Sequence, residues 1–161
     1  MKKLSHLALA FLAAFTLASA HAEVVRPAPN FTWGTGRTLK SWQGQPVVLL
    51  IAPSPRSSAF RKQASRIQAA YQELAARNVV FVAAFTDPEA AAEKIPSNVP
   101  FVIANNGAQI AANYNLEGAF ALAVIGKDGN LDLNSPKVVP ASRIMDMVIN
   151  NAEQQTAERK P

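Results

Sequence analysis

The chain has 161 residues, of which 16 are basic, 11 are acidic and none is cysteine. Because thiol–disulfide exchange and thiol-dependent peroxide reduction both need a thiolate, the missing cysteine excludes these two activities. A chain of this length can fold around one hydrophobic core without disulfides, so a single domain is expected.

The N-terminus has the order of features typical of a secretory signal peptide. Lys2 and Lys3 precede an apolar run over residues 7–17, and small residues follow it. We predict a signal peptide over residues 1–22, cut after Ala22, with a cut after Ala20 as the alternative. The apolar run is short for a membrane span, so a periplasmic or secreted protein is expected rather than one held by an uncleaved anchor.

Cleavage after Ala22 changes both the charge and the available chemistry. It leaves 14 basic and 11 acidic residues, a net charge of +3, and it removes both histidines, His6 and His21. Nucleic-acid binding is not expected, because it needs a larger basic excess with exposed aromatic residues. No transmembrane segment is expected after cleavage, since no later apolar stretch is long enough.

The domain is predicted to cover residues 30–153, after an extended, proline-rich lead-in over residues 23–29. Phe31 and Trp33 alternate with polar neighbours, as in a short strand. Residues 47–51 form a continuous apolar run, which is typical of a strand buried on both faces.

A long helix is predicted next. It starts at the cap candidates Ser57 and Ser58 and carries apolar residues at helical spacing as far as Asn78. Residues 79–85 are predicted to be a second buried strand. Asp87-Pro88 is a favourable helix start, so a further helix is predicted over residues 90–95.

Strands and helices are predicted to alternate in the second half of the chain as well. The predicted elements are a strand at 101–104, a helix at 108–114, a strand at 119–125, a hairpin turn at 127–130, a return strand at 131–133 and an amphipathic helix at 141–152. Residues 154–161 are predicted to form a disordered tail. This order of elements predicts the α/β class.

Three stretches carry a resemblance to a known superfamily. They are Pro29-Asn30-Phe31 with residues 39–46, residues 47–53, and the segment from Asn113-Tyr114-Asn115-Leu116 to Gly129. Together they resemble the thioredoxin-like superfamily, in particular its peroxiredoxins and exported thiol–disulfide reductases. The resemblance implies a three-layer α/β/α sandwich with a mixed central sheet.

The residues that would carry thiol chemistry in that superfamily are replaced here. Aligned on residues 47–51, the C-x-x-C pair of the reductases falls on Arg56 and Ala59. The peroxiredoxin frame P-x-x-x-T-x-x-C falls on Pro53, Ser57 and Phe60.

A second element beside the sulfur, a cis-proline in reductases or an arginine in peroxiredoxins, falls close to Phe120. Phe60 and Phe120 suggest that hydrophobic side chains fill the former pocket. The chain is also similar to exported thioredoxin-like domains that lack the active-site cysteines and share a G-K-D-G hairpin, here Gly126–Gly129. That likeness carries no function.

A basic run around the start of the first long helix is the candidate binding site. There is no acidic residue between Arg37 and Arg66, and helix N-termini favour anions. The candidate binding residues are Arg56, Ser57, Ser58, Arg61, Lys62 and Arg66. The alternative is a solvated helix face without a ligand.

Two smaller features have structural explanations as well. Trp33 and Trp42 are expected to pack in the core or at its edge, with a peptide-binding face as the alternative. Glu89 and Glu93 lie one helical turn apart, but no histidine completes a ligand set, so no metal site is predicted. No catalytic residue and no cofactor are predicted either.

These observations favour an exported, non-catalytic module that binds an envelope protein or a small anionic ligand. An enzyme of a non-thiol class that reuses the former active-site pocket is one alternative. A structural envelope component is the other. Convergent polar groups in a cleft near Arg56 and Ser57 would favour an enzyme.

Overall fold

The computed structural model describes residues 26–116 and 118–158, with residues 151–158 described as helix backbone alone. The predicted signal peptide, residues 1–22, lies outside them. The centre is a mixed five-stranded sheet with the order β5-β4-β3-β6-β7. The strands are β3 (Val47–Ala52), β4 (Val80–Phe85), β5 (Val102–Ile103), β6 (Ala121–Ile125) and β7 (Leu131–Ser135).

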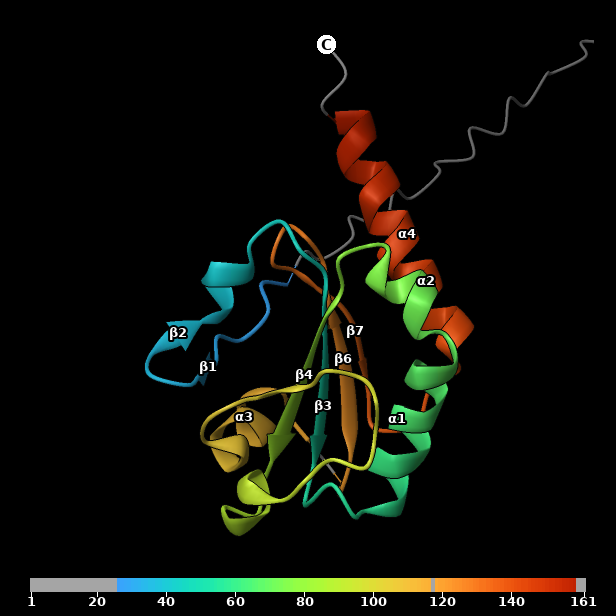
Figure 1. Cartoon of the computed structure of the whole chain (residues 1–161). Coiled ribbons are helices and arrows are strands. Elements are labelled where there is room, and N and C mark those ends of the chain that lie inside the picture. The colour runs from blue at the N-terminus through green and yellow to red at the C-terminus, as the bar shows by residue number, and fades with distance from the viewer. Residues whose placement is uncertain (1–25, 117, 159–161) are drawn as a thin grey trace, which may run out of the picture.

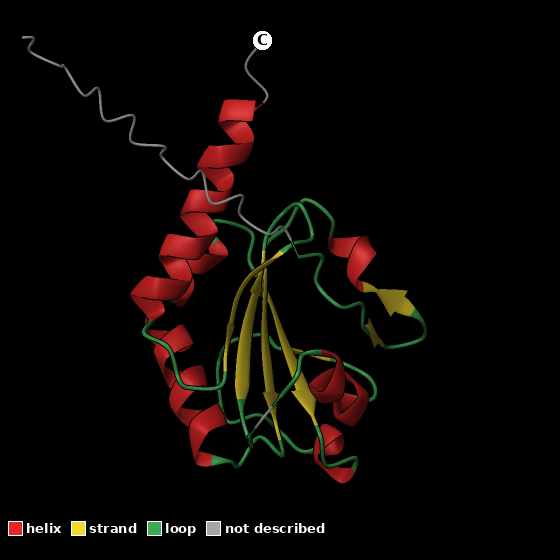
Figure 2. Cartoon of the chain, turned by 180° about the vertical axis from the view of Figure 1, so that it is seen from behind, coloured by secondary structure: helices red, strands yellow, loops and turns green. Residues whose placement is uncertain are grey.

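Strands β3, β4 and β5 run parallel, whereas β6 is antiparallel to both of its neighbours. Helices α1 (Ser58–Ala69), α2 (Tyr71–Ala75) and α4 (Ala141–Glu158) cover one face of the sheet (Figure 1). Helix α3 (Gly107–Asn113) lies on the other face, as the view from behind also shows (Figure 2). This is the predicted three-layer thioredoxin-like sandwich with a mixed central sheet.

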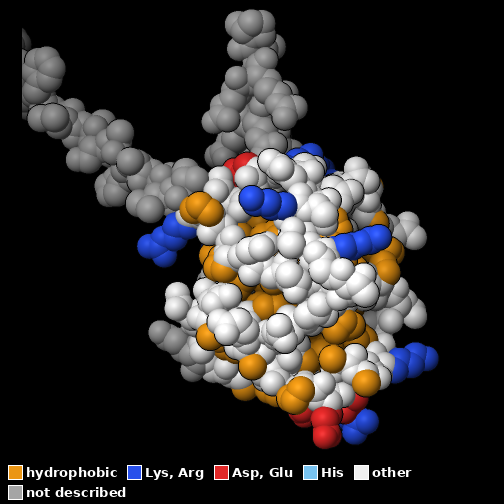
Figure 3. All heavy atoms as spheres, turned by 90° about the vertical axis from the view of Figure 1, so that its left-hand side faces the viewer, with side chains coloured by type: hydrophobic (Ala, Val, Ile, Leu, Met, Phe, Trp, Pro, Cys, Tyr) orange, Lys and Arg blue, Asp and Glu red, His pale blue; other side chains and the backbone are white. Residues whose placement is uncertain are grey.

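The second face also carries a small N-terminal unit. It consists of β1 (Thr32–Trp33) and β2 (Arg37–Thr38), which pair antiparallel, and the 3-10 helix η1 (Leu39–Trp42). Seen from this side, hydrophobic side chains reach the surface in small groups, and Lys and Arg side chains project separately from one another (Figure 3). Among the described residues, no helix is long and apolar enough to cross a membrane.

All six residues of β3 are buried, as the continuous apolar run predicts. Because successive side chains of a strand point to opposite faces, β3 contributes to two cores. Val48, Leu50 and Ala52 belong to the core on the α1 and α4 side. The residues between them belong to the core on the α3 side, with Phe31 and Trp33. A sheet covered on both faces needs apolar residues at every position of its central strand.

Two predicted helices are wrong in extent. The first breaks at Ala70, whose N–H donates to the Ile67 carbonyl three residues back, so the helix tightens and restarts as α2. Asn78 closes the segment with a left-handed φ of 57°. The helix predicted over residues 90–95 is only the 3-10 turn η2 (Glu89–Ala92), because Glu93 is already extended. The approach to Pro96 disfavours helical backbone before it.

The two ends of the domain also differ from the predicted pattern. The described part of the lead-in is attached to the β6–β7 turn, since Ala28 N–H donates to Gly129 O at 2.9 Å and Leu131 N–H donates to Arg26 O at 2.8 Å. At the other end, α4 continues to Glu158, beyond the predicted end at 152. Residues 154–158 are therefore helical where a disordered tail is predicted.

Two buried polar side chains tie distant segments together. Gln63 of α1 donates from Nε2 to Val139 O at 3.1 Å, and Val139 N–H donates to Gln63 Oε1 at 2.7 Å. Tyr114, at the end of α3, donates its hydroxyl to Pro29 O at 2.8 Å. Burial raises the pKa of the Tyr114 phenol well above its ordinary value, because ionisation would leave a charge away from water.

Candidate functional site

The predicted site lies where β3 passes into α1, next to the end of β4. Thr86 N–H donates to Ala52 O, and Asp87 N–H donates to Pro53 O, so the segments that follow the two strands are held together. Arg56 lies in this loop with 82 % of its side chain exposed, and its Nε is 3.0 Å from Oε2 of Glu93. Ser57 occupies the N-cap position of α1.

The position at which the sequence alignment predicts a peroxiredoxin thiol, Phe60, is closed to solvent. Phe60 has no exposed surface, and its ring packs against Phe85 and Phe101 at centroid distances of 5.2 and 5.7 Å. Phe120 belongs to the same buried cluster, and Ala59 packs against that cluster. Hydrophobic side chains therefore fill the space around Phe60 and Phe120.

Backbone packing makes the same end of the sheet tighter still. Gly107, the first residue of α3, lies against the end of β4, and a Cβ built on it would be 1.8 Å from Phe85 O. Only glycine fits at such an approach. The end of the sheet near Phe85 is consequently packed with no room for an added methyl group.

The basic residues of the predicted site are brought together only in part. Arg61 and Lys62 are exposed on α1, Arg66 is half-buried one turn further on, and Ser58 is exposed beside them. Arg56 is separate from this group, because its guanidinium is paired with Glu93. Glu93 itself thus serves as an ion-pair partner here rather than as half of a cation site with Glu89.

The electrostatics of α1 are unfavourable for a helix. Its twelve residues contain no acidic side chain, although acidic groups in the first turn would stabilise the dipole. Lys62 and Arg66 stand four residues apart, a spacing at which like charges destabilise a helix by about 0.2–0.5 kcal/mol. The arrangement favours anions near the exposed side of α1.

The described residues at this end contain no nucleophile paired with a base. Ser57 Oγ is buried without a hydrogen-bond partner among the described residues, and no histidine is present there to act as a base. Residues 26–116 and 118–150 contain no cluster of three His, Cys, Asp or Glu side chains that could hold a metal.

Sequence reasoning missed a cavity at the opposite end of the sheet. It has a volume of about 490 Å³ and lies between the lead-in, the segment of η1 and the β6–β7 turn. These three segments are far apart in the chain, so no local spacing marks them as one site. Two sequence signals fall on the cavity, the G-K-D-G hairpin at residues 126–129 and Trp42, for which a peptide-binding face is the alternative to core packing.

A family model named "Domain of unknown function (DUF4174)" matches residues 39–150, well over half of the chain. The chain belongs to this family. The DUF4174 match includes both ends of the sheet, since it runs from the start of η1 into α4. A comparison with curated proteins returned no match.

Solved structures share the fold of this DUF4174 chain at low sequence identity. A thiol:disulfide interchange protein from Bacteroides sp. is 14 % identical with a TM-score of 0.61, covering 84 % of this chain and 95 % of its own. The mitochondrial 2-Cys peroxiredoxin of Plasmodium falciparum is 17 % identical with a TM-score of 0.60, covering 84 % and 97 %.

The thioredoxin domain of a thiol-disulfide oxidoreductase from Bacteroides vulgatus is 16 % identical with a TM-score of 0.56, covering 80 % of this chain and 94 % of its own. At such identities the likeness shows the fold alone. The thioredoxin-like fold and the cysteine-free sequence are together consistent with a module without redox chemistry.

Proposed function

We propose that this DUF4174 chain is an exported, non-redox binding module that holds an acidic surface of an envelope protein against the exposed side of α1. The observation that carries the proposal is Phe60. The sequence alignment expects a reactive thiol at this position, but Phe60 has no exposed surface, and the chain contains no cysteine that could replace a thiol elsewhere.

Export is supported by the N-terminal sequence. A basic start, an apolar run over residues 7–17 and small residues up to Ala22 are the three parts of a cleavable signal peptide. The mature protein is expected to begin at Glu23. N-terminal sequencing of the protein recovered from the cell envelope tests this, and recovery of the chain with Met1 still present would contradict it.

The choice of partner is supported by the charges of α1. Arg61 and Lys62 are exposed, and no acidic side chain on the helix neutralises them. Because their positions near the N-terminus reduce helix stability, a role outside folding explains their presence best. Carboxylates of a partner would supply the negative charge that α1 itself lacks beside Arg61 and Lys62.

The absence of redox activity is tested with purified mature protein in insulin reduction and peroxide consumption. We expect rates equal to those of buffer in both assays, because neither a thiolate nor a histidine base is available. Turnover in either assay would contradict the proposal.

The binding surface is tested by affinity capture from an envelope extract with purified mature protein as bait. Arg61→Glu combined with Lys62→Glu should reduce capture of the specific partner about tenfold, because two attractive charges become repulsive. The control is Arg77→Glu with Lys137→Glu, which changes the net charge equally at exposed positions outside α1. Equal loss in both variants, or no loss in the α1 variant, would overturn the proposed surface.

A further inference from the structure

We propose that the cavity at the opposite end of the sheet is a second binding site, which takes a small amphipathic monocarboxylate. Its apolar body would lie along the inner wall, and its carboxylate would meet Lys40 at the rim. The site is independent of the partner surface on α1, since no lining residue comes from that helix.

The cavity has walls that are fixed by backbone hydrogen bonds. Ala28 N–H donates to Gly129 O at 2.9 Å, which joins the lead-in to the β6–β7 turn. Gly44 N–H donates to Lys127 O at 3.0 Å, which joins the segment after η1 to the same turn. Three distant segments thus form one frame around the cavity, and a preformed frame lowers the ordering cost of binding.

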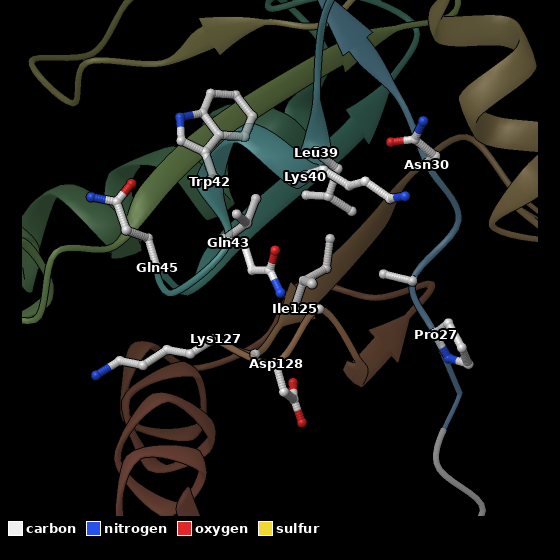
Figure 4. Close-up of a pocket in the computed structure, with 14 residues that line it drawn as sticks. Pro27, Asn30, Leu39, Lys40, Trp42, Gln43, Gln45, Ile125, Lys127 and Asp128 are labelled. Carbon is white, nitrogen blue, oxygen red and sulfur yellow. The ribbon is translucent and has the colours of Figure 1, made fainter.

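The size and the inner wall suit a small molecule with an apolar body. A volume of about 490 Å³ lies within the usual range for small-molecule sites, and the polar groups of such sites are few. Leu39, Val47 and Ile125 line the inner wall, at the ends of η1, β3 and β6. In the close-up, Ile125 lies at the centre of the cavity, facing the side chains of η1 (Figure 4).

An aromatic stack stands beside this wall. Trp42 lines the cavity and stacks on the buried Trp33, with ring centroids 3.3 Å apart and an interplanar angle of 5°. Phe31 packs near both rings at about 6.4 and 6.5 Å. Trp42, which forms part of the cavity wall, therefore packs against the core on the α3 side.

The rim carries positive charge on the cavity side. Lys40 extends along the cavity toward Asn30, and the Gln43 amide points in from the same segment (Figure 4). Among the described residues, neither Lys40 nor Lys127 forms an ion pair. Asp128 also lines the cavity and keeps its negative charge, but its carboxylate oxygens accept bonds from Asn130 and its side chain points away from Lys40 (Figure 4).

This charge pattern selects the head group of the ligand. The ammonium of Lys40, which extends toward Asn30, matches the acceptor oxygens of a carboxylate, and the Gln43 amide offers a further polar group near Ile125. A cationic head group would be repelled at the same place. A neutral alcohol would gain the apolar contacts alone.

The experiment is a titration of the mature protein with octanoate, octan-1-ol and octylammonium, followed by tryptophan fluorescence. The chain has two tryptophans, and both stand in the stack beside the cavity, so the signal reports on this site. We expect saturable octanoate binding about tenfold tighter than that of octan-1-ol, with octylammonium weakest. Each methylene added between hexanoate and decanoate should tighten binding about fourfold.

The variant Lys40→Gln separates a head-group contact from a structural role. It should weaken octanoate binding about tenfold and leave octan-1-ol binding unchanged, because the apolar wall is kept. Lys137→Gln is the matched control, since it removes the same charge at an exposed position outside both the cavity and α1 and should leave both affinities unchanged. Circular dichroism of the variants verifies the fold.

Three results would overturn the proposal. The first is octylammonium binding as tight as octanoate binding, and the second is an equal loss of octanoate affinity in Lys40→Gln and Lys137→Gln. The third is no saturable octanoate binding below about 10 mM. None of these outcomes would affect the capture experiment on α1, so the two proposals fail separately.

Discussion

The two ends of the central sheet use aromatic side chains in opposite ways. Where β3 enters α1, Phe60 packs inward against Phe85 and has no exposed surface. At the other end, Trp42 stacks on Trp33 and forms the side of an open cavity. In this chain, the end of the sheet near Phe60 is filled by aromatic side chains, and a cavity of about 490 Å³ lies at the far end.

The largest expected effect compares an aromatic residue from each end. Phe60→Ala should lower the free energy of unfolding by about 4 kcal/mol, because it empties a fully enclosed site that cannot fill with water. Trp42→Ala should cost about half as much, since Trp42 is half-buried and its removal enlarges a cavity that is already open. Urea denaturation measures both. An equal loss of unfolding free energy in the two variants would contradict the difference proposed between the closed and the open end.

Gly107→Ala tests how tightly the closed end is packed. The added Cβ would collide with Phe85 O, which is backbone and cannot rotate away, so we expect a loss of about 3 kcal/mol. Gly118→Ala is the control, because a Cβ there meets nothing within 4 Å. The same urea titration compares the two variants, and a Gly107→Ala variant as stable as the control would show that α3 has room to move.

Tyr114→Phe probes the attachment of the lead-in, which forms one wall of the open end. Loss of the hydroxyl bond to Pro29 O should cost about 1 kcal/mol. Thermal unfolding at neutral pH measures this cost. A stability equal to that of the parent protein would mean that the hydroxyl does not hold the lead-in.

The stability of the parent protein should also depend on pH in a way that the stability of Tyr114→Phe does not, because the Tyr114 phenol is buried. Burial raises the pKa of Tyr114 above its ordinary value of 10.0. The folded protein therefore keeps a proton that the unfolded chain loses as the pH rises above about 10. The contribution of Tyr114 to stability is complete below pH 10 and declines above it, by up to about 1.4 kcal/mol per pH unit. Tyr114→Phe should lack this decline, and parallel curves for the two proteins between pH 9 and 11 would contradict the assignment.

Most of the fold could be predicted because its signals are local. The apolar run of β3 identifies a strand buried on both faces, and the motifs from Asn113 to Gly129 place the hairpin in a thioredoxin-like order. The break at Ala70 could not be predicted, since its neighbours have good helix propensity and a hydrogen bond to Ile67 O decides the geometry. The end of η2 at Glu93 could not be predicted from Pro96, because proline restricts the residue directly before it and Glu93 stands three residues earlier.

The site was predictable to a smaller extent. Phe60 could be placed in the core because the family frame fixes its position and its side chain is large and apolar. The pair of Arg56 and Glu93 joins residues from two different loops, and no spacing in the sequence indicates it. The cavity depends on the meeting of the lead-in, η1 and the β6–β7 turn, which follows from the tertiary fold alone.

The contrast between the two ends is tested most directly by NMR mapping of octanoate on the isotope-labelled mature protein. The account predicts that amide signals of Ala28, Gln43 and residues 126–129 shift in a saturable way, while those of residues 56–62 stay unchanged. Saturable shifts at residues 56–62 without shifts around the cavity would contradict it, because the closed end would then be the one that holds the ligand.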